Sequence, residues 1–62
     1  MIELTKMGSG EKFLLNPTYI ESIEETPTPT VHLHEGTTYL VQESPQEVVR
    51  LIRAWRNDEA RP

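Results

Sequence analysis

The segment VHLHEGTTYLVQ, residues 31–42, carries the strongest structural signal in this 62-residue chain. Apolar and polar residues alternate on both sides of Glu35-Gly36, which is typical of two half-buried strands joined by a short turn. We therefore predict a β-hairpin over residues 31–42. Its apolar face carries Val31, Leu33, Tyr39 and Val41, and its opposite face carries His32, His34, Thr38 and Leu40.

A second hairpin is predicted at the start of the chain. Ile2 and Leu4 alternate with polar residues, as in a half-buried strand. Gly8-Ser9-Gly10 follows, and its glycines tolerate the backbone conformations of a tight connection. We expect residues 2–6 to pair with residues 11–15, whose second half is apolar on both faces.

The region between the hairpins is rich in turn signals. Asn16-Pro17 predicts a tight turn in which the asparagine side chain accepts a hydrogen bond from a following amide. The spacing of three from Ile20 to Ile23 breaks strand alternation, so the next strand should begin near Glu21. Two prolines within residues 26–30 predict a stiff turn or edge segment, because proline lacks the amide donor.

The last third of the chain predicts a helix that begins at Ser44-Pro45-Gln46-Glu47. Serine is a preferred N-cap, proline suits the first helical position, and Glu47 is placed to reach back to the cap amide. One apolar stripe follows, made of Val48, Leu51, Ile52 and Trp55. Residues 58–62 are polar and end in proline, so we expect a frayed C-terminal tail.

Together these elements predict an α+β fold: a small antiparallel β-meander of about five short strands, packed by one C-terminal helix. Residues 1–57 form a single domain, which at this size buries only about 60% of its unfolded surface. We expect Leu14, Leu40 and Val49 to lie off the core. Such an uncovered face or edge invites a second copy, so we predict a homo-oligomer.

Composition narrows the classes of protein. Cysteine is absent, so disulfides and thiolate zinc sites are excluded. No apolar run approaches the roughly 20 residues of a membrane helix, and we expect a cytoplasmic protein. Residues 1–43 hold two lysines and seven glutamates, whereas residues 44–62 hold four arginines and three acids. The acidic body disfavours nucleic acid and favours a protein partner.

His32 and His34 lie two positions apart on a predicted strand, so both side chains should project from the same face and could share a metal ion. Zinc usually takes three or four protein ligands, and Glu35 or Thr38 is a poor third. We interpret both histidines as solvent-facing strand residues and predict no metal site.

No arrangement of residues predicts catalysis. Glu21, Glu24 and Glu25 are better explained as a solvated acidic strand than as an acid/base pair, since neighbouring strand residues point to opposite faces. Gly8-Ser9-Gly10 lacks the lysine and helix of a phosphate loop. We therefore expect neither an enzyme nor a cofactor.

Arg50, Arg53 and Arg56 form the candidate partner-binding group. An ordinary helix surface is the simpler explanation, with Glu47 and Arg50 able to form an i, i+3 ion pair. An arginine row also suits an acidic protein partner or anionic lipid at the inner membrane surface, although three charges fall short of a polybasic cluster of about four to eight.

Several phrases occur in a characteristic order: Met1-Ile2-Glu3-Leu4-Thr5-Lys6, Asn16, Ile20-Glu21-Ser22-Ile23-Glu24, Pro27, Val31-His32-Leu33, Gly36, Tyr39-Leu40-Val41 and Glu43-Ser44. This order resembles the FlbD/SwrD family of small flagellar and swarming-motility proteins, over residues 1 to about 55. The main departures are Lys6 in place of arginine, Thr28-Pro29 in place of Asp-Thr, and Glu35-Gly36 in place of Asn-Gly. Glutamate tolerates positive φ less well than asparagine, so the last turn should be of another type.

The resemblance implies a non-enzymatic cytoplasmic bacterial protein that supports flagellar motor power through protein–protein interaction. Its implied partners are flagellar motor or stator-associated proteins at the cytoplasmic face of the motor. Two alternatives stay open. The opening as far as about Glu11 also resembles CsrA-type RNA-binding regulators. A small oligomeric interaction module outside motility is the other alternative, because a likeness of fold does not fix function.

Overall fold

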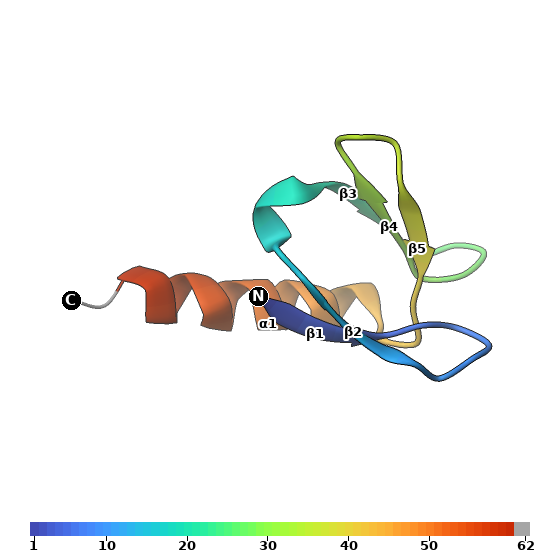
Figure 1. The fold of residues 1–62 in the computed structure, drawn as a ribbon, viewed down its shortest axis with the longest axis horizontal. Coiled ribbons are helices and arrows are strands. Elements are labelled where there is room, and N and C mark those ends of the chain that lie inside the picture. The colour runs from blue at the N-terminus through green and yellow to red at the C-terminus, as the bar shows by residue number, and fades with distance from the viewer. Residues whose placement is uncertain (61–62) are drawn as a thin grey trace.

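The computed structural model describes residues 1–60, with side chains described as far as Asp58. Five strands, one short 3-10 helix and one C-terminal helix give the predicted α+β fold (Figure 1). In chain order the elements are β1 (Ile2–Thr5), β2 (Lys12–Leu15), η1 (Pro17–Tyr19), β3 (Ile20–Glu24), β4 (Thr30–Leu33), β5 (Thr38–Leu40) and α1 (Pro45–Ala60).

The strands form two antiparallel sheets instead of one continuous meander. β1 pairs with β2, and β4 lies between β3 and β5. The two sheets meet where the chain continues beyond β1 and β5, through an antiparallel bridge between Lys6 and Val41. On either side of it, the Met7 N–H donates to the Leu40 carbonyl at 2.9 Å and the Gln42 N–H donates to the Thr5 carbonyl at 2.9 Å.

The meander is interrupted by the turn at Asn16. The Asn16 side chain accepts a hydrogen bond from the Thr18 N–H at 3.0 Å, as predicted, and its carbonyl accepts one from the Tyr19 N–H at 3.1 Å. These bonds wind residues 17–19 into η1. The chain therefore leaves β2 without continuing into a strand that pairs with it, and β3 joins β4 instead.

β3 begins at Ile20, one residue before the predicted start. A register shift between Ile20 and Ser22 places an extra residue, Glu21, in this strand. The bulge adds one residue to the strand, so the side chains of Ile20 and Ile23 can both point inward although they are three positions apart. Both are half-buried and pack against the core. The spacing that breaks strand alternation is thus accommodated inside the strand.

The predicted hairpin over residues 31–42 is confirmed as β4 and β5. The Leu33 carbonyl accepts from the Gly36 N–H at 3.0 Å, and the Leu33 N–H donates to the Thr37 carbonyl at 2.8 Å. Gly36 has a φ of 102°, and within residues 1–60 no residue other than glycine has positive φ. The turn needs positive φ only at its glycine, which explains how Glu35 is accommodated.

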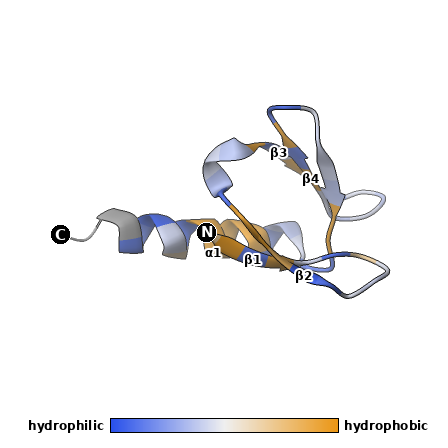
Figure 2. Cartoon of the chain, in the orientation of Figure 1, coloured by the Kyte–Doolittle hydropathy of each residue, from blue (hydrophilic) through white to orange (hydrophobic). Residues whose placement is uncertain are grey.

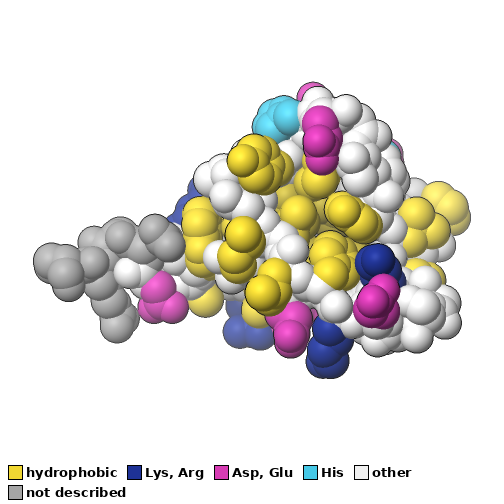
Figure 3. Space-filling view, in the orientation of Figure 1, with side chains coloured by type: hydrophobic (Ala, Val, Ile, Leu, Met, Phe, Trp, Pro, Cys, Tyr) yellow, Lys and Arg dark blue, Asp and Glu magenta, His cyan; other side chains and the backbone are white. Residues whose placement is uncertain are grey.

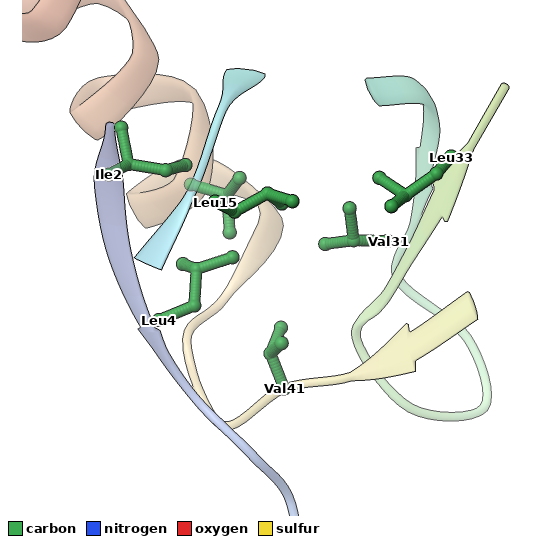
Figure 4. Packing of buried hydrophobic residues seen from close by; sticks show 7 residues of the cluster. Ile2, Leu4, Leu15, Val31, Leu33 and Val41 are labelled. Carbon is green, nitrogen blue, oxygen red and sulfur yellow. The ribbon is translucent and has the colours of Figure 1, made fainter. Parts of the chain in front are cut away.

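The core lies between the two sheets and α1. Figure 4 shows side chains of β1 and β2 directed toward those of β4 and of the segment after β5. Val48 adds α1 to this cluster, and α1 contacts β1. The helix therefore covers the two-stranded sheet, and the sheet of β3, β4 and β5 faces the β1–β2 hairpin. The buried residues of this core are Ile2, Leu4, Leu15, Val31, Leu33, Val41 and Val48.

α1 begins at Pro45 after the N-cap Ser44, as predicted. The Ser44 hydroxyl accepts from the Glu47 N–H at 3.2 Å, and the Ser44 carbonyl accepts from the Val48 N–H at 3.0 Å. The helix continues to Ala60, so the predicted tail over 58–62 begins inside it, and residues 61–62 lie outside the described residues. Hydrophobic residues of α1 are concentrated beside the β1–β2 hairpin (Figure 2).

Candidate interaction surface

The three predicted arginines are all exposed on α1, but they do not share one environment. The Arg50 guanidinium embraces the Glu47 carboxylate, with Nε donating to Oε1 at 2.8 Å and Nη2 donating to Oε2. These hydrogen bonds lower the pKa of Glu47 and raise the pKa of Arg50. The predicted i, i+3 pair is therefore confirmed. Glu47 faces Arg50 instead of reaching back to the cap amide.

Arg53 lies beside an open hollow of about 320 Å³, which is also lined by Pro45, Gln46 and Val49. Three residues of helix fall about 60° short of a full turn, so Arg50, Arg53 and Arg56 are each offset by about 60° around α1 from the one before. Val49 lies about one turn before Arg53 and Arg56 about one turn after it. Arg53 makes no ion pair with any side chain of the described residues.

The structure gives the three predicted arginines different surroundings. Arg50 is held by Glu47, whereas Val49, with 37% of its surface exposed, lines the hollow together with Arg53. Pro45 and Gln46 also line the hollow, and sequence reasoning did not single them out. A periodic signal was present, because positions 45, 49, 53 and 56 recur at helical spacing along one edge of the core stripe. Figure 3 shows one face of the whole molecule, on which hydrophobic side chains gather beside charged ones.

The histidines occupy the other end of the molecule and are engaged by separate carboxylates. His32 Nε2 lies 2.5 Å from Glu24 Oε1, and His32 Nδ1 lies 3.2 Å from the Thr38 hydroxyl. These contacts link all three strands of the sheet. His34 Nδ1 lies 3.8 Å from Glu21 Oε2. Among residues 1–60, no group of three or more potential ligands is placed to hold a metal ion.

The carboxylate of Glu43 joins distant parts of the chain. Its Oε1 accepts from the Thr5 N–H at 2.9 Å, and its Oε2 accepts from the Thr5 hydroxyl at 2.8 Å. Partial burial alone raises the pKa of Glu43, but these hydrogen bonds outweigh it with help from Lys12, and the pKa is lowered. Sequence reasoning missed this contact, although both residues belong to the phrases that carry the family resemblance.

Within the part of the chain that the structure describes, no helix has the length and apolar character needed to cross a membrane.

The chain was compared with protein families, curated proteins and solved structures. No curated protein and no solved structure matches the chain. The family model described as FlbD, flagellar and swarming motility proteins, matches residues 1–58. This match spans nearly the whole sequence, so the chain belongs to the FlbD family of flagellar and swarming motility proteins.

Proposed function

We propose that this protein is a non-enzymatic accessory of flagellar motility that supports motor power through protein–protein interaction. The observation that carries the proposal is the family match over residues 1–58. It spans both hairpins and most of α1, whereas the resemblance to RNA-binding regulators ends near Glu11. The motility role therefore accounts for far more of the sequence.

The surface chemistry supports an interacting protein. Val49 and Arg53 place an apolar side chain and a cation beside the same hollow on α1. Apolar contact supplies binding energy and charge complementarity supplies specificity in protein interfaces. The proposed partners are flagellar motor or stator-associated proteins, and the proposed location is the cytoplasmic face of the motor.

Self-association is part of the proposal. Leu14 and Leu40 are 66% and 49% exposed, as expected for residues off the core. Met7 is 44% exposed and adjoins Leu40 through its backbone hydrogen bond. Large exposed apolar side chains on so small a domain favour burial against a second copy. Sedimentation at several protein concentrations measures the oligomeric state, and a monomer throughout would contradict this part.

The motility role is tested by deleting the gene in its host. We expect normal numbers of flagella on stained cells and reduced torque in tethered cells, with torque restored by a wild-type copy. Missing flagella would instead indicate a role in assembly or gene expression. Unchanged torque and swimming speed would contradict the proposal, as would salt-sensitive binding of the purified protein to single-stranded RNA leaders.

A further inference from the structure

One side of α1 combines an open hollow with two arginines that form no ion pair with any side chain the structure describes. We define the α1 strip as Pro45, Val49, Arg53 and Arg56, which follow one another at intervals of four, four and three residues. Pro45, Val49 and Arg53 line the hollow of about 320 Å³, and Arg56 continues the strip toward the C-terminal end. At 1.5 Å per residue the strip is about 16 Å long.

The hollow and the charges lie in a fixed order along the strip. Pro45 and Val49 supply apolar surface at the N-terminal end, where the hollow has room for one large side chain. Arg53 borders that surface, and Arg56 lies one helical turn further on. A ligand complementary to the strip therefore has an apolar group followed by negative charge, spread over about five residues of extended chain.

We propose that the α1 strip binds an acidic protein segment that anchors one apolar side chain in the hollow. The inference rests on the proposed function, because it names the chemistry of the partner through which that function acts. Carboxylates of the segment pair with the guanidinium groups of Arg53 and Arg56, which are suited to two-pronged hydrogen bonding. The apolar side chain packs on Pro45 and Val49.

Arg53 is the arginine that carries this recognition. Arg50 already donates to both carboxylate oxygens of Glu47, so a new partner would have to displace an existing ion pair. Arg53 has no such internal carboxylate among the described side chains and stands beside the hollow. The two arginines have the same charge and are both exposed, which makes Arg50 the matched control.

An acidic protein segment fits the strip better than an anionic membrane. The strip offers two arginines, fewer than the roughly four to eight basic residues of lipid-binding clusters. A recess lined by proline and valine also accepts a protruding side chain more readily than a layer of headgroups.

Binding is tested with the full chain and a fluorescein-labelled synthetic peptide that carries one leucine followed by four glutamates. We expect anisotropy to report binding that weakens with salt, since the contacts include charges. R53Q should lower the affinity about tenfold or more, and R50Q less than about twofold. V49Q should also lower it. Circular dichroism verifies that each variant keeps its helix.

Three outcomes would overturn the inference: no binding at about 1 mM peptide, equal effects of R53Q and R50Q, or tighter association of the wild type with phosphatidylserine vesicles than with the peptide. Equal effects would mean that net charge, and not the strip, controls binding. A peptide with four glutamines in place of the glutamates separates the acidic contribution from that of the leucine.

The same variants distinguish this inference from the proposed function in cells. If deletion lowers torque, R50Q should restore it and R53Q or V49Q should restore it only partly at equal protein level. Full restoration by R53Q and V49Q would overturn the role of the strip and leave the motor role intact. Unchanged torque after deletion would overturn the motor role, whatever the peptide measurements give.

Discussion

Thr5 and Glu43 are 38 positions apart, yet Thr5 donates both its backbone N–H and its hydroxyl to the Glu43 carboxylate, at 2.9 and 2.8 Å. Thr5 is the last residue of β1, and Glu43 directly precedes the N-cap of α1. The contact therefore fixes the entry to the helix against the end of the first strand. It also gives a structural reason for the presence of these two residues among the family phrases.

Glu43→Ala should reduce the free energy of unfolding by about 1–2 kcal/mol, because the substitution leaves the Thr5 donors without their charged acceptor. Urea unfolding followed by Trp55 fluorescence measures the change. Glu35→Ala is the control, because Glu35 is exposed and its side chain, among the described residues, accepts a hydrogen bond only from the Thr37 hydroxyl, at 3.2 Å. Equal stability of the two variants would contradict a stabilising contact at Glu43.

Acidification should reveal the same contact. The folded pKa of Glu43 lies below the ordinary value of 4.5, so the unfolded chain binds this proton more readily. The contribution of Glu43 is complete above the unfolded pKa and is lost as pH falls through the folded pKa. The stability difference between wild type and Glu43→Gln should thus shrink as pH falls from about 5. Parallel pH profiles would refute this linkage.

Trp55→Ala should destabilise the fold by about 2 kcal/mol, less than the roughly 3–5 kcal/mol expected for a fully buried tryptophan. The reason is that Trp55 packs against the core but is only partly buried. Thermal unfolding monitored by circular dichroism measures it, and Leu4→Ala, at a fully buried position, should cost more.

Gly36→Ala should cost about 1–2 kcal/mol, because an alanine at the Gly36 φ of 102° is conformationally strained. Nothing lies within 4 Å of the position that the added methyl group would occupy, so the cost comes from the backbone and not from a clash. Gly36→Asn should be milder, since asparagine tolerates positive φ better. Equal losses of stability in urea for the two variants would argue against backbone strain.

Local features of this protein follow from the sequence with little loss. The β4–β5 hairpin and the Ser44 cap depend on alternation and on hydrogen bonds between residues a few positions apart. The Glu47–Arg50 pair is equally local. From its position Glu47 could bond to the cap amide or to Arg50, and in the structure it bonds to Arg50. The FlbD family was recognisable from the order of such phrases, and the match over residues 1–58 confirms it.

The candidate site was only half predictable. Its cations were found as a row in the sequence, and Val49 was expected off the core. Their separation into Arg50, held by Glu47, and Arg53, beside the hollow, depends on how side chains at different angles around α1 meet their neighbours. Sequence spacing determines those angles, but it does not show that a hollow lies beside Arg53.

Contacts across the whole chain lay beyond sequence reasoning. The Lys6–Val41 bridge and the Thr5–Glu43 contact join segments that are more than thirty positions apart. The split of the strands into two sheets was likewise not predicted. Strand patterns state which face of each strand is buried, but several strand orders satisfy the same pattern. The observed order packs the inward faces of both sheets and α1 into one core. Tertiary packing decides among strand orders because the buried side chains must fill one core while the backbone groups around them stay paired.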